Sequence, residues 1–235
     1  MVWQRSPRPL FQAVSHLNNS GVAVNNMLKT RIDVMRHGEP EGGDVLRGST
    51  DHLLTEKGWQ QARQRTEYFI ARNEGWNKII SSPLSRCKNF AEELADKLQL
   101  PLEVQQDWRE IDYGDWENQS TKDLWTKNAE HMQQLWADPM QFCAPNGEAV
   151  SDFTQRILSA WRQTIADNTG EKVLVVCHGG VMRILLQQLL DMSPKAMSRF
   201  KIPYAALSQF EIDHDSEKPE EKYWTSLISH HGEEL

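Results

Sequence analysis

The stretch Ile32-Asp33-Val34-Met35-Arg36-His37-Gly38 is the part of the sequence that decides the fold class. The run 32–35 alternates in polarity, which is typical of a short β-strand, and Arg36 and His37 follow at its carboxyl end. A second histidine, His178, follows the apolar run 173–177, which predicts another strand. Because open α/β sheets bind ligands at the carboxyl ends of their strands, we expect both histidines at one ligand site. The arginine beside the first histidine indicates an anionic ligand such as phosphate.

The composition is that of an ordinary soluble protein with room for one large α/β domain. The chain has 235 residues, of which 39% are hydrophobic and 25% charged, and its formal net charge is -7. This acidic balance argues against a nucleic-acid partner, and no apolar stretch is long enough to span a membrane. The three cysteines, Cys87, Cys143 and Cys177, show neither paired nor metal-ligand spacing, so we expect a reducing, cytoplasmic location.

The N-terminal segment 1–30 differs in composition from the rest of the chain. It contains Arg5, Arg8 and Lys29 but no acidic residue, a bias that organelle transit peptides share. We favour a disordered leader or a misassigned start codon, because the first strand begins soon after Met27, which would then be the true start. The expected organisation is a leader over residues 1–30 and a single domain over residues 31–230.

Strands and helices are expected to alternate along this domain. Strands are predicted at 32–35, 78–81, 102–104, 173–177, 205–212 and 224–228, and helices at 56–70, 83–98, 118–142, 148–165 and 181–190. Thr55 is predicted to cap the first helix and Ser82 the second, with Pro83 in its first position. The alternation predicts a three-layer α/β/α fold with a mostly parallel central sheet. We expect the tryptophans between 116 and 136 to be core residues, with a lid over the pocket as the alternative.

Arg86 adds a second arginine to the expected site. It follows the strand 78–81 and lies in the first turn of the next helix, where free backbone N–H groups and the helix dipole attract anions. A cation is unfavourable there by itself, and a bound anion would explain it. Together with Arg36, His37 and His178 it makes about the donor set that a tetrahedral oxyanion needs, because planar guanidinium groups bind phosphate oxygens in pairs.

Several segments in a fixed order carry a resemblance to a known family. They are Arg36-His37-Gly38, Ser81-Ser82-Pro83-Leu84-Ser85-Arg86, Glu110-Ile111-Asp112-Tyr113-Gly114-Asp115-Trp116-Glu117, Pro145-Asn146-Gly147-Glu148 and His178-Gly179. Through these segments, over roughly residues 31 to 212, the chain resembles the histidine phosphatase superfamily, which has the phosphoglycerate mutase-like fold.

The resemblance implies a role for each polar residue of the site. His37 would be the nucleophile that forms a phosphohistidine, and a hydrogen bond from its other ring nitrogen to a backbone carbonyl would set the reactive tautomer. Arg36, Arg86 and His178 would hold the oxygens of the transferred phosphoryl group. Glu110 would protonate the leaving oxygen and then activate the hydrolytic water. The resemblance implies no metal and no cofactor.

The proton donor has alternatives nearby in the sequence. We expect Glu110, and the alternatives are Asp112, Asp115, Glu117 and Glu39. The double role requires a carboxyl group that is protonated when the substrate binds, and a neighbouring dianion would raise its pKa in that direction.

The loop after Arg47 and Gly48 offers further donors to phosphate. The hydroxyl groups of Ser49 and Thr50 are expected either to bind phosphate or to form a turn and cap. Gly179, directly after the second histidine, belongs to the same expected phosphate site.

The residues after the first histidine indicate a subfamily. Phosphoglycerate mutases carry a Trp-Asn pair there, whereas this chain has Glu39-Pro40-Glu41-Gly42-Gly43. That segment, with 47–51 and 54–58, resembles the α-ribazole phosphatases of cobalamin synthesis and their broad-specificity relatives. We expect a metal-independent phosphomonoesterase that acts on a small phosphorylated metabolite, with α-ribazole phosphate as one candidate. A phosphoglycerate mutase-type phosphomutase and a catalytically silent phosphate-binding protein are the alternatives, and the oligomeric state stays open.

Overall fold

The computed structural model describes residues 28–219 and 222–233. Most of the predicted leader, residues 1–27, lies outside this part of the chain, and the first strand begins at Lys29. Within the described residues the strands form a six-stranded sheet in the order β3-β2-β4-β1-β5-β6. The strands are β1 (Lys29–Arg36), β2 (Lys78–Ser81), β3 (Leu102–Val104), β4 (Lys172–Cys177), β5 (Leu207–His214) and β6 (Tyr223–His231).

The direction of the strands places two separate loops at one edge of the sheet. Strands β1, β2, β3 and β4 run parallel, and β5 is antiparallel to both of its neighbours. Near the end of β1, Met35 pairs with Leu207 at the beginning of β5. The residues that precede β5 therefore lie at the same edge as the residues that follow β1.

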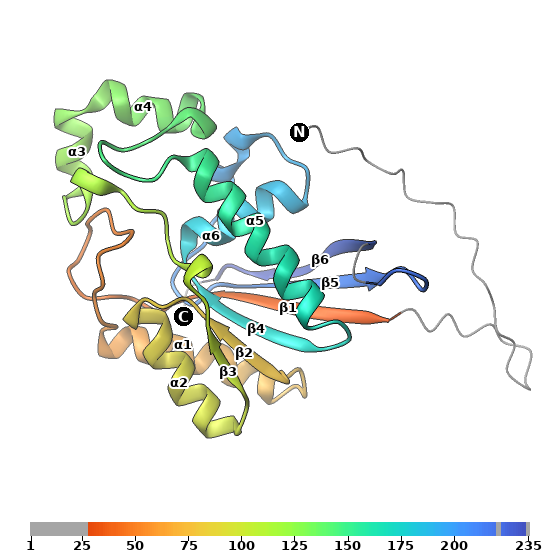
Figure 1. The fold of residues 1–235 in the computed structure, drawn as a ribbon. Helices are drawn as coiled ribbons and strands as arrows, with labels where there is room; N and C mark the ends of the chain where they lie inside the picture. The colour runs from red at the N-terminus through yellow and green to blue at the C-terminus, as the bar shows by residue number, and fades with distance from the viewer. Residues whose placement is uncertain (1–27, 220–221, 234–235) are drawn as a thin grey trace, which may run out of the picture.

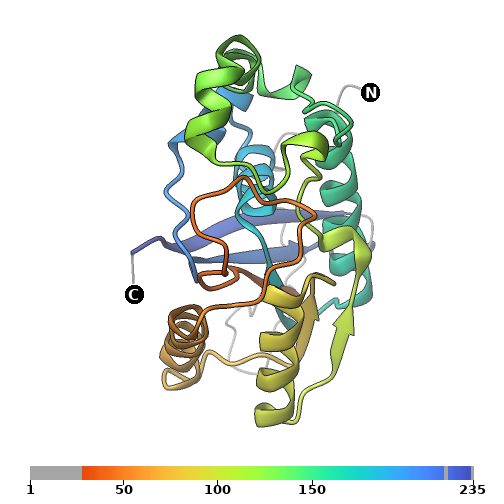
Figure 2. The same cartoon turned by 90° about the vertical axis from the view of Figure 1, so that its left-hand side faces the viewer.

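Helices cover both faces of the sheet, which confirms the predicted three-layer architecture (Figure 1). The helices are α1 (Glu56–Ile70), α2 (Ser85–Leu98), α3 (Thr121–Lys127), α4 (Ala129–Ala137), α5 (Val150–Asp167) and α6 (Gly179–Leu189). Figures 1 and 2 both show α1 and α2 on one face and α5 and α6 on the other. In the same views α3 and α4 lie beyond the sheet, on the side of α5 and α6.

The start of α2 differs from the prediction. Thr55 caps α1 as predicted, by accepting a hydrogen bond from the Gly58 amide, but Ser82 does not cap α2. The backbone of Leu84 is extended, so the helix begins only at Ser85. The carboxylate of Asp51 accepts hydrogen bonds from the backbone N and Oγ of Ser85, both at 2.7 Å, and caps the helix in its place. The hydroxyl oxygen of Ser82 accepts instead from the amide of Leu84 at 3.3 Å.

The predicted helical stretch 118–142 is interrupted. Asn128 departs from helical geometry between α3 and α4, and a short 3-10 turn, η3 (Pro139–Gln141), follows. The core prediction for the tryptophans is right for Trp116, which is 4% exposed, and wrong for Trp125, which is 37% exposed. A second 3-10 segment, η4 (Pro194–Arg199), comes after α6.

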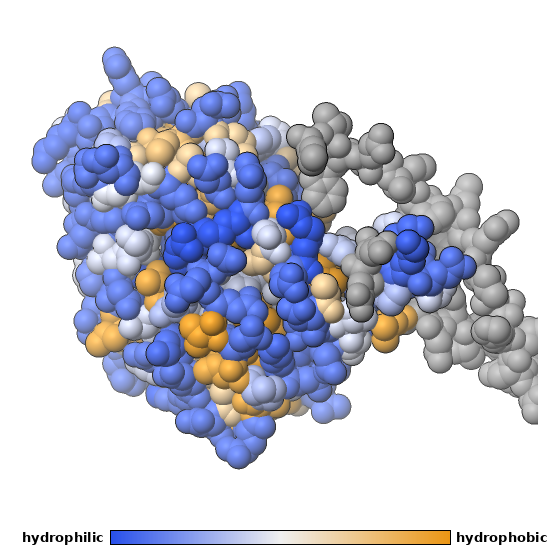
Figure 3. Space-filling view, viewed as in Figure 1, coloured by the Kyte–Doolittle hydropathy of each residue, from blue (hydrophilic) through white to orange (hydrophobic). Residues whose placement is uncertain are grey.

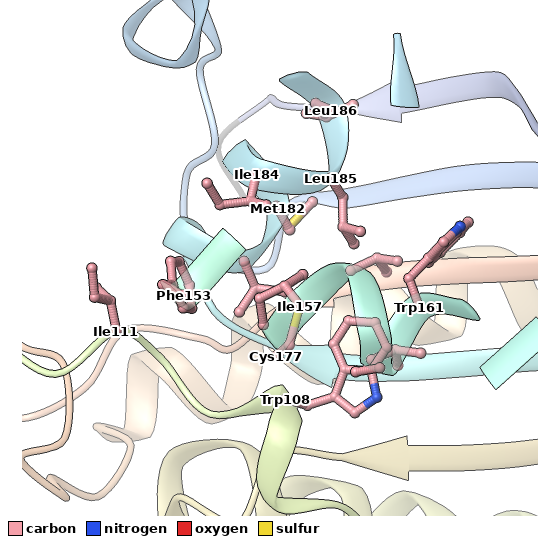
Figure 4. Packing of buried hydrophobic residues seen from close by; sticks show 14 of the residues in the cluster. Trp108, Ile111, Phe153, Ile157, Trp161, Cys177, Met182, Ile184, Leu185 and Leu186 are labelled. Carbon is pink, nitrogen blue, oxygen red and sulfur yellow. The ribbon is translucent and has the colours of Figure 1, made fainter. Parts of the chain in front are cut away.

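Two apolar clusters hold the sheet between its helix layers. Val175 of β4 belongs to the cluster beneath α5 and α6, and its neighbour Val176 belongs to the cluster against α1 and α2, because strand side chains alternate between faces. Figure 4 shows part of the first cluster, including the buried Trp108 and Trp161. Burial of apolar surface stabilises the fold by roughly 25 cal/mol per Å², so the loops at the strand ends stand on a rigid base.

The surface that Figure 3 shows has no large apolar patch. The face seen in Figure 3 is mainly hydrophilic, with small groups of apolar residues between the polar ones. None of the described helices is both long and apolar enough to cross a membrane. The three cysteines are free thiols.

Candidate active site

The two histidines expected at one site meet at the carboxyl edge of the sheet. Arg36 of β1 pairs in register with Cys177 of the parallel strand β4, so His37 and His178 are the next residues on adjacent strands. The amide of His37 donates a hydrogen bond to the Cys177 carbonyl at 3.0 Å. The two imidazole rings lie edge to face with their centroids 5.3 Å apart.

The hydrogen bonding of His37 leaves one ring nitrogen free. Its Nδ1 lies 2.6 Å from the carbonyl oxygen of Gly38, and a carbonyl only accepts, so Nδ1 carries the proton. This is the backbone hydrogen bond that the family resemblance implies. Burial, and then the charges of Arg86 and Arg36, hold the pKa of His37 well below its usual value. The ring is therefore neutral at ordinary pH, with Nε2 unprotonated and able to attack.

Close packing of glycines fixes the backbone around this histidine. A Cβ on Gly38 would lie 1.9 Å from the carbonyl oxygen of Gly58 in the first turn of α1. Only a residue without a side chain fits so near another backbone. The glycine of the Arg-His-Gly tripeptide thus locks the carbonyl that orients the ring of His37.

Two arginines with unpartnered donors lie near His37. Arg86 is buried, and its Nη1 and Nη2 donate to the carbonyl oxygens of Thr50 and Gly48, both at 2.7 Å. Arg36 donates from Nη1 to the carbonyl of Ile202 at 2.6 Å. Among the described residues, the buried Nε of each arginine has no hydrogen-bond partner. Buried donors without partners are unfavourable, so two such guanidinium groups beside His37 indicate a site that an anion completes.

His178 is held by a residue that was expected to cap a helix. Its ring is fully buried, and its Nε2 lies 2.7 Å from the hydroxyl oxygen of Ser82. Burial, followed by the charges of Arg86, His37 and Arg36, lowers the pKa of His178 well below its usual value. The hydroxyl of Ser82, which does not cap α2, thus contacts the second histidine.

Glu110 lies close to both arginines. The residue is 7% exposed, and its carboxylate oxygens accept hydrogen bonds from the amides of Ile111 at 3.1 Å and Gly180 at 2.9 Å. Burial raises the pKa of Glu110 despite these hydrogen bonds and the nearby charges of Arg86 and Arg36. A carboxyl group in this setting keeps its proton to higher pH, as a general acid requires.

The alternative carboxylates are committed elsewhere. Glu117 accepts from the backbone amides of residues 48–50 at 2.8 to 3.1 Å, and Asp112 accepts from the amide of Gly114 at 2.8 Å. Asp115 accepts from the side chain of Asn146 at 2.9 Å. Glu39 pairs with the ammonium group of Lys57 at 2.9 Å. These contacts give each alternative a structural role and leave Glu110 as the buried carboxyl group beside both arginines.

Ser49 and Thr50 do not offer their hydroxyl groups to the site. The Ser49 hydroxyl donates to Asp112 at 3.2 Å, and the Thr50 hydroxyl donates to Glu117 at 2.5 Å. Each hydroxyl has a single proton to donate, so these contacts match the turn role that was the alternative to phosphate binding. The loop acts instead through the backbone carbonyls of Gly48 and Thr50, which fix the guanidinium group of Arg86.

The start of α6 lies against the arginine of the first strand. A Cβ on Gly179 would lie 3.3 Å from Nε of Arg36, so the glycine backbone packs directly on the guanidinium group. Gly180 is more restricted, because its Cβ would lie 2.3 Å from Oε1 of Glu110. The two glycines therefore let the helix approach the anion site and the carboxyl group at once.

Tyr204 and Arg47 are site residues that the sequence did not reveal. The Tyr204 ring lies 5.9 Å from the His37 ring, and the Arg36 guanidinium stands 4.1 Å from its centroid. Burial lowers the pKa of Arg47, while Tyr204 raises it by charge and a hydrogen bond. Arg47 lies in the loop directly before Gly48, Ser49 and Thr50, and its residue type alone did not mark it as a site residue. Tyr204 reaches the site because β5 is antiparallel to β1, which no local motif indicates.

Two of the curated relatives carry the name of a phosphatase. The uncharacterized phosphatase PhoE of Bacillus subtilis is 29% identical over 185 residues, which are 78% of this chain and 89% of that protein. The adenosylcobalamin/alpha-ribazole phosphatase of Salmonella typhimurium is 28% identical over 185 residues, 77% of this chain and 90% of that protein.

Two solved structures and the sequence model of a family also match this chain. The alpha-ribazole phosphatase from Shigella flexneri aligns with a TM-score of 0.68 and 25% identity, over 86% of this chain and 96% of that one. YhfR of Bacillus stearothermophilus, at 24% identity, shares the fold with a TM-score of 0.75 over 88% of this chain and 98% of that one. The sequence model of the histidine phosphatase superfamily (branch 1) matches residues 32–225. Because this match extends over most of the chain, the protein belongs to the histidine phosphatase superfamily and is an enzyme that acts on phosphate esters.

Proposed function

We propose that the enzyme is a phosphomonoesterase that hydrolyses a small phosphate ester through a phosphohistidine on His37. The observation that carries this proposal is the tautomer of the buried imidazole. Its Nδ1 is tied to the Gly38 carbonyl, so the lone pair stands on Nε2, and the charges of Arg86 and Arg36 act on the same ring. A neutral nucleophile near two cationic groups suits attack on a phosphate dianion.

In the first half of the proposed reaction, Nε2 of His37 attacks phosphorus and the bond to the ester oxygen breaks. The leaving oxygen takes the proton of Glu110, so the alcohol departs neutral and the carboxylate remains. Charge on the phosphoryl oxygens is stabilised by Arg36, Arg86 and His178, which are already held in place by protein hydrogen bonds.

In the second half, water gives a proton to the Glu110 carboxylate and attacks phosphorus as the bond to Nε2 breaks. Inorganic phosphate leaves, and both His37 and Glu110 return to their starting protonation states. The raised pKa of Glu110 supports this cycle, because the residue must be an acid in one step and a base in the next.

The relatives support α-ribazole phosphate as one candidate substrate. Proteins of Salmonella typhimurium and Escherichia coli at 28% and 27% identity carry the name adenosylcobalamin/alpha-ribazole phosphatase. A probable phosphoglycerate mutase of Yersinia pestis is 28% identical over 181 residues. A mutase would return the phosphoryl group of His37 to a second hydroxyl instead of to water, so the fate of the phosphoryl group separates the two functions.

The test is phosphate release in EDTA by the wild type and by His37→Ala. The esters are p-nitrophenyl phosphate, α-ribazole phosphate, 3-phosphoglycerate and several sugar phosphates. We expect the wild type to release phosphate and to form an acid-labile phosphoenzyme, and His37→Ala to do neither while keeping the wild-type melting temperature. Near-normal turnover in His37→Ala would overturn the nucleophile assignment. Isomerisation of 3-phosphoglycerate without phosphate release would overturn the phosphatase in favour of a mutase.

A further inference from the structure

A cavity of about 230 Å³ opens beside Glu110, and none of the steps described above accounts for its lining. It is bounded by α5, α6 and the segments η3 and η4, together with residues that follow Glu110. Ligand sites for larger molecules measure roughly 300 to 1,000 Å³, so this one suits a group of about one or two rings.

The position of the cavity assigns it to the leaving group. Gly180 lines the cavity, and its amide donates a hydrogen bond to the Glu110 carboxylate. The cavity therefore lies next to the proposed proton donor. Arg183 and Ile184 follow at the third and fourth positions along α6, and both also line it. Residues at this spacing share one face of a helix. The cavity therefore runs along α6 away from the carboxyl group that meets the leaving oxygen.

Most of the lining is apolar. Ile111, Phe153 and Ile184 lie together toward one end of the buried cluster in Figure 4. All three belong to the cavity wall, and Val150 and Met197 extend it. Such a wall favours an apolar ring or chain over a free sugar, because it offers few hydrogen bonds to hydroxyl groups.

Two cationic side chains interrupt this apolar wall, and the described residues that line the cavity include no acidic one. The cations are Arg183 and Lys195. A second hollow, of about 440 Å³, shares Arg183 and Ser198 with the first and adds Arg199 and Lys201, again without an acidic lining residue in the described chain. In a protein with a net charge of -7, this concentration of positive charge is local and specific.

The guanidinium group of Arg183 is held in place with donors to spare. Its Nη1 donates to the carbonyl oxygens of Met197 at 2.6 Å and Phe200 at 2.8 Å, which fixes it between α6 and η4. Among the described residues, neither Nε nor Nη2 has a hydrogen-bond partner. Burial lowers the pKa of Arg183, and the nearby groups Glu110 and Tyr113 raise it. A partly desolvated cation with two free donors is a site for an anionic group.

We propose that the leaving group of the preferred substrate combines an apolar ring or chain with a second anionic group, a carboxylate or a phosphate, that Arg183 binds. Lys195 adds positive charge at the same wall. The inference rests on the proposed function, since it concerns the alcohol that the phosphatase releases.

The test compares esters that differ only at the far end of the leaving group. Benzyl phosphate is the neutral parent, and its para position carries a carboxylate, a non-hydrolysable phosphonate or, as a neutral isostere, a carboxamide. We expect the wild-type kcat/KM to favour at least one anionic ester over the carboxamide by about tenfold or more. The carboxylate and phosphonate arms show which anion is bound.

The variants are Arg183→Met, which removes the charge, and Arg183→Lys, which keeps it. We expect the ratio of kcat/KM for the anionic ester to that for the carboxamide to fall to about one in Arg183→Met and to recover in part in Arg183→Lys. Lys195→Met is a second variant that leaves the contacts of Arg183 with Met197 and Phe200 in place, and it should lower the ratio severalfold. Arg72→Met, at an exposed arginine stacked on Tyr68, is the matched control and should keep the wild-type ratio.

Two results would overturn the inference alone. One is normal hydrolysis of benzyl phosphate by the wild type without preference for either anion, and the other is an unchanged preference in Arg183→Met. Failure of the wild type to release phosphate from any ester, with no phosphohistidine, would overturn the proposed function and this inference together.

Discussion

The amide of Gly180 donates a hydrogen bond to Oε2 of Glu110 at 2.9 Å, and a Cβ on that glycine would lie 2.3 Å from Oε1 of the same carboxyl group. The first turn of α6 therefore positions the proposed proton donor and also lines the cavity for the leaving group. This relationship joins the chemistry of the site to its selectivity, because one helix positions both.

Replacing this glycine should impair proton donation specifically. Gly180→Ala would push the Glu110 carboxyl group away, because the new methyl group has no other space. We expect kcat for alkyl phosphates, whose leaving groups need a proton, to fall by about tenfold or more, and kcat for p-nitrophenyl phosphate to fall much less. Steady-state kinetics with both esters measure the difference. Gly75→Ala, at a glycine with nothing within 4 Å of its added Cβ, is the control, and equal losses on both esters would argue against a specific effect on Glu110.

The raised pKa of Glu110 predicts the pH dependence. The free enzyme must carry a protonated Glu110 and a neutral His37, and the pKa of one is raised while that of the other is lowered. The kcat/KM for an alkyl phosphate should therefore stay constant below the pKa of Glu110 and fall as pH rises through that pKa. Glu110→Gln should remove this alkaline fall and lower the rate by about 100-fold or more, while p-nitrophenyl phosphate is affected less. An unchanged profile in Glu110→Gln would place the acid elsewhere.

Arg86 should contribute mainly to the transition state. Arg86→Ala removes the unpartnered Nε donor and also releases the carbonyl oxygens of Gly48 and Thr50. We expect kcat to fall by about 100-fold or more, the usual effect of losing one preorganised donor. Arg162→Ala, at an exposed arginine on α5, controls for loss of a positive charge. A rise in KM at constant kcat would show instead that Arg86 binds substrate and transition state equally.

Away from the site, Asp33 should make stability depend on pH. Its side chain is fully buried on β1, and Oδ2 accepts hydrogen bonds from Trp76 at 2.8 Å and Gln209 at 3.3 Å. Arg31 Nε lies 3.3 Å from Oδ1, but neither atom has a hydrogen-bond partner among the described residues. Burial raises the pKa of Asp33 from 3.8 to about 6, against the opposing charge of Arg31.

The sign follows from proton uptake by the folded state. Between pH 3.8 and about 6 the folded protein binds the Asp33 proton more tightly than the unfolded chain, so its contribution to stability is present below this window and is lost as pH rises through it. Asp33→Asn should remove this loss, on the order of 2–3 kcal/mol at neutral pH relative to pH 4. Urea unfolding at several pH values measures it, with the exposed Asp96→Asn as control. Parallel stability curves for wild type and Asp33→Asn would contradict the shift.

Much of the fold and of the site could be predicted from local patterns. The strand before Arg36 and the apolar strand before His178 are short runs whose side-chain polarity is enough to assign them, and parallel pairing then places the two histidines together. A glycine must follow the first histidine, because a Cβ on Gly38 would lie 1.9 Å from the carbonyl oxygen of Gly58.

The start of α2 shows where local rules fail. Ser82 before a proline has the residue type of a cap, but Asp51, distant in the sequence, takes that role and leaves the Ser82 hydroxyl for His178. The hydroxyls of Ser49 and Thr50 are likewise taken by Asp112 and Glu117. A side chain with one donor proton goes to the best partner that the whole fold offers, and that partner is not visible in its own segment.

By itself, then, the sequence determined the strand ends, the charged residues that follow them and the family, because these depend on hydrophobic periodicity and on motifs of adjacent residues. Only the tertiary structure decided which carboxyl group is buried beside the arginines, that the antiparallel β5 brings Tyr204 to the site, and that Arg183 stands in an apolar cavity next to Glu110. The physical reason is that burial, and the pKa shifts and unpaired donors that follow from it, are set by contacts between segments far apart in the chain.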